Sequence, residues 1–409
     1  MARIVDVHAR RVWDSRGRAT VEAEVILKGG RGRAIAPAGA STGAGEAKSI
    51  AAADAVRNVN GPIRQALLGV DARFQDAVDA KLVALDGTPD KSRFGANAIV
   101  AVSLACLHAS AAAAKKPLWR HLAGERRVAM PVPQIQIYGG GAHASGRVDL
   151  QDYMVTCPGA GSFTESLDWI AEVYRAAGAR LAKKGAHAGV ADEGGWWPAF
   201  KSNEEGLAEL VGAISDAGFE PGTDVAIALD VAASQFHRGG RYHLALENRS
   251  LTADQLHAML LRWLEAYPIV SIEDPFAEHD LEAMRAFTKA AGARVQIVGD
   301  DLFVTSASRL DPALANCVLL KPNQVGTVSE TLACWNAAKD KGMRAIVSAR
   351  SGETEDVSIV HLAVGWGVSQ LKVGSFSRSE RMAKWNEGLR IEEALGGKQL
   401  LYPARKLFK

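Results

Sequence analysis

Three acidic residues stand at the ends of three apolar, strand-like segments of the sequence. Asp230 ends VAIALD, Glu273 follows YPIVSI, and Asp300 ends VQIVGD. Two further segments of the same kind, NCVLLK and QLK, end in Lys321 and Lys372. In a (β/α)8 barrel the carboxyl ends of all strands open into one shared mouth, so these five side chains would converge there.

This set of residue types points to metal-assisted proton abstraction. Three carboxylates form an oxygen-rich site suited to Mg²⁺, and a lysine beside such a site can remove a proton next to a metal-bound carboxylate. A single strand-end acid is as well explained as the N-cap of the next helix, but three acids followed by two lysines favour a site. The doublets Glu273-Asp274 and Asp300-Asp301 leave open which acid of each faces the mouth.

The elements that must position these residues begin after residue 130. Residues 3–36 alternate in a strand-like way, and glycines punctuate them, which predicts a small antiparallel sheet with hairpins. Residues 46–123 have mostly helical patterns, and Pro131-Val132-Pro133 marks a boundary. We therefore predict an α+β domain over residues 1–130.

Residues 131–409 alternate short apolar runs with helical segments, which is typical of βαβ units around a parallel sheet. The number of units favours a closed barrel. We predict an α/β protein in which a small N-terminal α+β capping domain precedes a modified TIM (β/α)8 barrel that carries the catalytic residues. The tail LYPARKLFK is expected to be an exposed terminus.

Composition narrows the function classes. A net charge of +2 over 409 residues gives no signal for nucleic acid or membrane surfaces. Four cysteines lie far apart without a CxxC pair, which argues for reduced thiols in a cytoplasmic protein and against a zinc site or a disulfide framework. The apolar segment 98–114 is interrupted by His108 and by serines, so we interpret it as a buried helix and predict no membrane span. The first residues contain no apolar stretch of signal-peptide length, so we expect no signal peptide.

Ten motifs resemble those of the enolase (phosphopyruvate hydratase) family, in order from about residue 3 to about residue 395: DSRGRATVE, PAGASTG, GANAIVAVSLA, GGGAHA, ADEGG, SIEDP, VGDD, LLKPNQVGT, RSGETED and RSERMAKWN. The resemblance implies a lyase that eliminates water from 2-phospho-D-glycerate to give phosphoenolpyruvate. It also implies two Mg²⁺ ions during turnover, a small phosphorylated carboxylate as the substrate, and a homodimer or homo-octamer.

The resemblance also implies roles for the strand-end residues. Asp230, Glu273 and Asp300 would bind the tighter Mg²⁺ ion, which holds the substrate carboxylate. Lys321 would be the general base, and nearby positive charge would lower its pKa. Lys372 would help to stabilise the doubly charged enolate.

Further roles follow for residues of the loops. Glu193 in ADEGG would assist departure of the hydroxide, and Ser41 in PAGASTG would close over the site and bind the second Mg²⁺. His143 in GGGAHA would lie near the substrate phosphoryl group, and Arg350 and Ser351 would hold that group.

Two departures from the family pattern fall near the leaving-group end of the substrate. Enolases read HRSGET where this chain has Ala349 before Arg350, and QEF where it has Gln151-Asp152-Tyr153. Gln151 thus retains the substrate-binding position, and Asp152 takes the catalytic glutamate's position with one methylene fewer. Smaller changes stand at other positions of the site: Ala38 for Ser, Gly139 for Asn and Gln235 for Glu.

These departures leave three hypotheses for the function of the protein. The first is an enolase, with slow turnover. The second is a paralogue acting on a modified carboxylate, such as the carboxyphosphonoenolpyruvate synthase of phosphonate biosynthesis. The third is a non-catalytic binding protein that keeps the fold and uses surface or terminal lysines such as Lys409.

Overall fold

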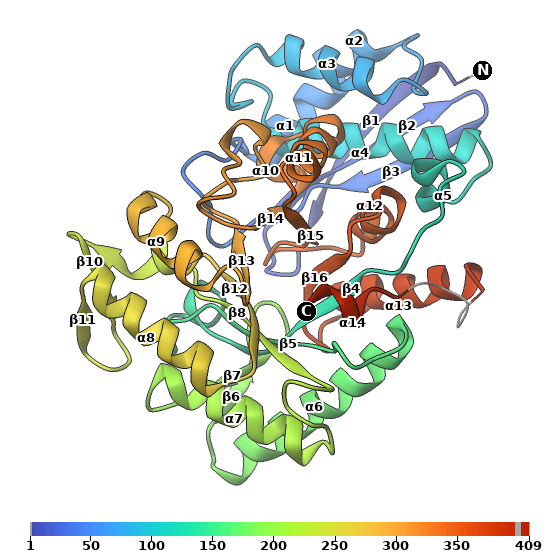
Figure 1. Ribbon diagram of the computed structural model, residues 1–409. Coiled ribbons are helices and arrows are strands. Elements are labelled where there is room, and N and C mark those ends of the chain that lie inside the picture. Colours follow the sequence, from blue (N-terminus) through green and yellow to red (C-terminus); the bar gives the residue numbers. More distant parts are fainter. Residues whose placement is uncertain (1, 397–401, 409) are drawn as a thin grey trace.

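A computed structural model describes residues 2–396 and 402–408 of the chain. Its N-terminal part is an antiparallel sheet in the order β1 (Ile4–Trp13), β2 (Ala19–Leu27), β3 (Gly30–Ile35), as the alternation of residues 3–36 predicts. Helix α4 (Ala96–Ala113) lies against this sheet (Figure 1). A Cβ atom on Gly32 would lie 2.1 Å from the backbone nitrogen of Ala109, so only glycine permits this close approach.

Helix α4 is the core of this N-terminal part. It combines helix-forming alanines with apolar residues on all its faces, and nearly all of its side chains are buried. Among the described residues, α4 is the single helix long and apolar enough to cross a membrane, and 83% of it is buried inside the protein. The interpretation of this segment as a buried helix is therefore confirmed. Shorter helices surround it: α1 (Ala52–Asn58), η1 (Val59–Ile63), α2 (Arg64–Leu67), α3 (Gln75–Asp86) and α5 (Leu118–Ala123).

The rest of the chain forms an eight-stranded barrel, which confirms the predicted fold class (Figure 1). Its strands are β4 (Val132–Gly139), β5 (Asp152–Thr156), β8 (Ala226–Asp230), β12 (Ile269–Glu273), β13 (Gln296–Gly299), β14 (Cys317–Leu320), β15 (Arg344–Ser348) and β16 (Gln370–Gly374). Pairing of β16 with β4 closes the barrel. Strand β5 runs antiparallel to both of its neighbours, because β4 is followed by the short η2 (Gly141–Ala144) and not by a crossover helix.

Helices cover the outside of the barrel: α6 (Phe163–Lys183), α7 (Asn203–Asp216), α8 (Ala253–Ala266), α9 (Leu281–Ala291), α11 (Val328–Asp340), α12 (Ser358–Trp366) and α13 (Ser379–Ala394). Side chains of Ser162, Ser202, Thr252, Asp280 and Thr327 accept a backbone N–H at the start of five of them. Shorter elements lie in the loops: α10 (Pro322–Val325), η3 (Ala233–Phe236), η4 (Ala307–Arg309), β6 (His187–Val190), β7 (Trp196–Pro198), β9 (His237–Arg238), β10 (Arg241–Leu244) and β11 (Arg249–Leu251).

The C-terminal tail differs from its expected exposure. In helix α14 (Ala404–Leu407), Ala404 and Leu407 are buried in a small cluster with Val132, at the start of β4. The Tyr402 hydroxyl lies 2.7 Å from the Ser166 hydroxyl of α6. Burial of these apolar groups against the bottom of the barrel is the physical reason for the difference. Lys409 lies outside the described residues.

Candidate active site

The five residues predicted to stand at strand ends lie together at the mouth of the barrel, although β16 continues past Lys372 to Gly374. Asp230 and Glu273 end the paired strands β8 and β12, whereas Asp300 and Lys321 directly follow β13 and β14. The Lys372 ammonium lies 2.7 Å from Asp230 Oδ2 and 2.9 Å from Glu273 Oε2. Lys321 Nζ lies 2.5 Å from Asp300 Oδ2. All five side chains are buried, so their charges interact with little screening by water.

Backbone geometry decides the role of the second acid in the first doublet. Asp274 has φ of 38°, in the left-handed region. Its carboxylate accepts the backbone N–H of Asp300 at 3.0 Å and that of Asp301 at 2.8 Å. Asp274 therefore fixes the loop that leaves β13, and the carboxylate of Glu273 is free to meet Lys372.

The carboxylates are suited to a cation. Burial and the charge of Asp230 raise the pKa of Glu273 well above its ordinary value, and burial together with Asp300 raises that of Asp301 to about 7. Glu273 Oε1 is buried and has no hydrogen-bond partner. A divalent cation would supply the missing positive charge and a partner for this oxygen.

Lys321 and Lys372 occupy part of the space between these carboxylates. Within the described chain, the oxygens of Asp274, Asp300 and Asp301 all lie within 4.8 Å of one another, but Asp230, Glu273 and Asp300 do not form such a group. Lys372 bridges two of those three acids. A cation bound by all three would therefore require the Lys372 ammonium to move aside.

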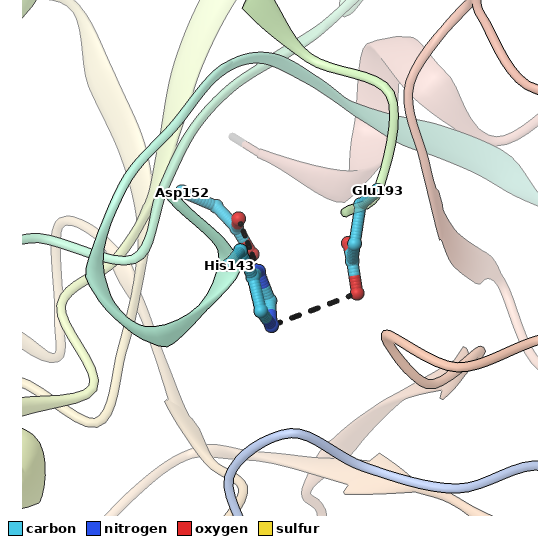
Figure 2. Close-up of side chains that lie close together, drawn as sticks. All are labelled: His143, Asp152 and Glu193. Carbon is cyan, nitrogen blue, oxygen red and sulfur yellow. Dashed lines mark hydrogen bonds and ion pairs between the residues drawn. The ribbon is translucent and has the colours of Figure 1, made fainter. Parts of the chain in front are cut away.

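A second buried cluster joins His143, Asp152 and Glu193 (Figure 2). His143 Nδ1 lies 3.1 Å from Asp152 Oδ1, and His143 Nε2 lies 3.9 Å from Glu193 Oε1. Because different ring nitrogens face the two carboxylates, the geometry is that of a proton relay and not of a metal chelate. Burial disfavours the imidazolium, but the charges of Glu193 and Asp152 outweigh it and raise the pKa of His143.

Asp152, which is one methylene shorter than the glutamate of the family pattern, lies behind His143. Asp152 is fully buried, and Gln136 also donates to its Oδ1 atom. Despite burial, His143 and Lys372 hold the pKa of Asp152 well below its ordinary value. The walls of the small cavity at the mouth include the following residues, among which Asp152 is absent: Gly39, Ala40, Ser41, His143, Gln151, Glu193, Lys321, Ser348, Ala349, Arg350, Ser351 and Lys372. Asp152 can therefore act on a molecule in the cavity only through the neighbours that line it: His143, and Lys372, whose Nζ lies 3.5 Å from Asp152 Oδ2.

The opposite wall is built from the N-terminal domain and β15. Arg350 donates to both carboxylate oxygens of Glu46, at 2.9 and 3.1 Å, and to the carbonyl of Ser41 at 3.0 Å. Ser351 Oγ accepts the backbone N–H of Ala40 at 2.6 Å. The loop of residues 37–46, called the lid loop below, is thus tied to the residues predicted to hold a phosphoryl group. Ser41 Oγ lies 3.4 Å from Gln151 Oε1, and Gln151 Nε2 lies 2.9 Å from Asp230 Oδ2.

Sequence reasoning missed several supporting residues. Glu46 closes the lid loop on Arg350, and Gln324 Nε2 donates to Asp300 Oδ1 at 2.9 Å. Arg381 is fully buried and donates to the carbonyls of Arg350, Val373 and Ser351 at 2.6, 2.9 and 2.5 Å. The arginine of RSERMAKWN stands in a quoted motif, but nothing local in the sequence shows that it reaches these carbonyls.

Arg381→Leu is expected to lower the free energy of unfolding by about 3 kcal/mol or more, because three buried carbonyls lose their donor at about 1–3 kcal/mol each. Urea unfolding measures the change. The matched control is Arg175→Leu on α6, where the arginine is exposed and pairs with Glu172; a surface change of this kind shifts stability by about 0.5 kcal/mol or less. Equal losses in the two variants would contradict the role of Arg381.

Comparison with known proteins covers nearly the whole chain. The family model described as "Enolase, N-terminal domain" matches residues 4–122, and that described as "Enolase, C-terminal TIM barrel domain" matches residues 127–409. A curated protein of Desulfitobacterium hafniense (strain Y51), "Enolase 1", is 45% identical over 424 aligned positions, which cover 99% of this chain and 97% of that protein.

Proposed function

This chain belongs to the enolase family and is an enolase-type lyase, and from that premise we propose that it is Mg²⁺-dependent and converts 2-phospho-D-glycerate to phosphoenolpyruvate. The observation that carries the proposal is the meeting of Lys321 and Lys372 with the carboxylates of Asp230, Glu273 and Asp300. A binding protein would have no use for two buried lysines beside three buried acids, since such a cluster is costly to desolvate.

We propose that Asp230, Glu273 and Asp300 hold one Mg²⁺ ion, and that Ser41 joins a second ion during turnover. Bound Mg²⁺ would neutralise the substrate carboxylate and the charge that develops on it. The oxygen-only donors suit this ion, and the partnerless Glu273 Oε1 supports the assignment.

The protein's own groups would perform the elimination. The Lys321 amine takes the proton α to the carboxylate, and the Lys372 ammonium stabilises the resulting enolate. When the C–O bond breaks, its electron pair leaves with the oxygen, and Glu193, adjoining His143, supplies the proton that makes water. Arg350 and Ser351 hold the phosphoryl group, and Gln151 orients the substrate between Ser41 and Asp230.

The direct test is formation of phosphoenolpyruvate, followed by its ultraviolet absorbance. Purified protein with Mg²⁺ and 2-phospho-D-glycerate should produce it, and excess EDTA should stop the reaction. Turnover that continues unchanged in EDTA would overturn the metal dependence. A protein that binds no Mg²⁺, with or without phosphoglycerate, would instead support the non-catalytic reading.

Glu273→Gln is expected to weaken Mg²⁺ binding at least about tenfold, because affinity for this ion depends on the number of charged ligands. Isothermal titration with MgCl₂ measures the change. Glu282→Gln on α9 removes the same charge from an exposed position and should leave the affinity unaltered. Similar affinities for the two variants would exclude Glu273 as a ligand.

Mg²⁺ affinity is also expected to fall as the pH is lowered through about 7. The raised pKa values of Asp301, about 7, and of Glu273 mean that the cluster holds protons in the absence of metal. A cation must displace these protons, so acid opposes binding. Titrations at pH 7 in buffers of different ionisation enthalpy should reveal proton release; identical heats in all buffers would contradict the prediction.

The leaving-group end supports a second candidate, a paralogue with the same proton abstraction on a modified carboxylate, as in carboxyphosphonoenolpyruvate synthase. Ala349 presents only a methyl group to the cavity, and Asp152 is withdrawn behind His143. This end therefore has a smaller side chain than the family pattern and lacks one titratable group. Poor turnover of 2-phospho-D-glycerate would favour the paralogue.

We also propose the wider setting that the family implies: a capping domain over residues 1–130, a catalytic barrel over 131–409, a cytoplasmic location and a homodimer or homo-octamer. Arg350 donates hydrogen bonds to Glu46 and to the carbonyl of Ser41 in the lid loop, which supports a capping role for the N-terminal domain. The four buried free cysteines support a reducing compartment.

A further inference from the structure

We propose that His237 and His279 form a binding site for a transition-metal ion of the Zn²⁺, Cu²⁺ and Ni²⁺ class, separate from the active site. His237 follows η3, and His279 lies in the loop between β12 and α9. Their nearest ring nitrogens, Nδ1 of His237 and Nε2 of His279, are 3.1 Å apart. The site does not depend on the proposed catalytic function.

The geometry of the two rings is that of a chelate. Their centroids are 4.8 Å apart and their planes meet at 59°. A straight N–H···N hydrogen bond of the same length would place the centroids about 5.4 Å apart. If a metal ion lay about 2.05 Å from each of these nitrogens, the N–ion–N angle would be about 98°. The ring centroids would then lie about 4.8 Å apart. Both observed distances therefore suit two imidazoles directed at one point.

The surroundings of His237 favour the neutral imidazole, which is the form that binds a metal ion. Burial and the neighbouring His279 lower the pKa of His237, so its imidazole is neutral at pH 7. Asp280 and His243 also face His237, but the Asp280 carboxylate accepts the Tyr242 hydroxyl and His243 contacts the carbonyl of Arg238.

Two imidazoles alone select the kind of ion. In the part of the chain that the structure describes, no ligand atom of a third His, Cys, Asp or Glu side chain lies within 4.8 Å of both nitrogens. Water would complete the coordination. Imidazole binds Zn²⁺, Cu²⁺ and Ni²⁺, whereas Mg²⁺ prefers oxygen. Excess Mg²⁺ therefore fills the oxygen-rich active site without competing for the histidines.

The location gives such an ion a structural consequence. Ser234 Oγ accepts the backbone N–H of Glu278 at 2.9 Å, next to the histidine pair. The Glu278 carboxylate in turn accepts the backbone N–H of Ala44, in the lid loop, at 3.1 Å. A bound ion would cross-link the loops that leave β8 and β12 and would hold Glu278 under the lid loop.

The test is Cu²⁺ binding followed by electron paramagnetic resonance, with Mg²⁺ in large excess. We expect one Cu²⁺ per chain with nitrogen hyperfine structure from two imidazoles. His279→Ala should weaken this binding at least tenfold and remove one nitrogen from the spectrum. The matched control His8→Ala removes an exposed histidine of β1 and should change neither. Unaltered binding in His279→Ala, or a spectrum with oxygen ligands alone, would overturn the proposal and leave a simple hydrogen bond.

A second measurement separates loss of the site from loss of the fold. Zn²⁺ should raise the melting temperature of the wild-type protein, because an ion that binds only the folded chain stabilises it. His237→Ala and His279→Ala should melt as cooperatively as the wild type without added ion and should lose the shift. A Zn²⁺-induced shift that persists in both variants would place the ion elsewhere and refute the site.

Discussion

Lys321→Ala is expected to lower kcat for phosphoenolpyruvate formation by about 10²–10⁴-fold, the range for loss of a positioned general base. The ammonium of Lys321 lies at the exit of β14, 2.5 Å from Asp300, and its side chain lines the cavity. An alanine at this position leaves the barrel intact and removes the group that can accept the α proton. Steady-state kinetics with 2-phospho-D-glycerate and saturating Mg²⁺ measure the effect.

A base must lose its own proton first, and the site explains how Lys321 could do so. Burial favours the neutral amine, but the adjacent Asp300 carboxylate outweighs it and raises the pKa of Lys321. Arg350 and Lys372 act in the opposite direction. Glu273 also raises the pKa of Lys321. Once the charges of Asp300 and Glu273 are engaged by a cation, burial and the two positive neighbours remain, and the pKa of Lys321 falls. Metal binding and activation of the base are thereby coupled.

Two controls make this prediction specific. Lys289→Ala removes an exposed lysine from α9 and should leave kcat unchanged. Lys321→Ala should still bind Mg²⁺, because the lysine is not a ligand. Equal rates for Lys321→Ala and wild type would remove Lys321 from the mechanism, whereas loss of Mg²⁺ binding would show that the substitution damages the metal site instead.

Four of the five strand ends were predictable because a local signal determines them, whereas β16 continues past Lys372 to Gly374. Apolar runs that stop at an acid or a lysine indicate both the strand and the direction in which it opens, and the closed barrel brings these ends together. The antiparallel sheet and the buried helix α4 follow from period-2 alternation and from an uninterrupted apolar pattern in the same way.

Features that depend on distant contacts could not be predicted. Nothing near Asp274 shows that its backbone adopts a left-handed conformation and turns its carboxylate toward the amides of Asp300 and Asp301. The reach of Arg381 to the carbonyl of Arg350, and the position of Asp152 behind His143, depend on packing between segments far apart in the chain. The burial of the tail against Val132 has the same origin.

The double substitution Ala349→His with Asp152→Glu is expected to raise turnover of 2-phospho-D-glycerate by about 10²–10⁴-fold, because it returns an acid–base group to the leaving-group end. Ala349 lines the cavity, so a larger side chain there would extend into it. Asp152 is tightly enclosed by His143 and Gln136, and a longer acid would press toward the cavity. Steady-state kinetics measure kcat and KM for the double and both single variants.

The two changes should act as a unit. Because they meet at one end of the substrate, the gain from the pair should exceed the product of the single gains. Ala349→Phe fills the same space without a hydrogen-bonding group and should give no gain, which separates chemistry from packing. Overpacking at Asp152→Glu costs about 1–3 kcal/mol of stability, so thermal unfolding must accompany the kinetics. A stably folded double variant without increased turnover would show that these two positions do not limit turnover of 2-phospho-D-glycerate, and the second candidate, a paralogue with a modified substrate, would lose the observation that supports it.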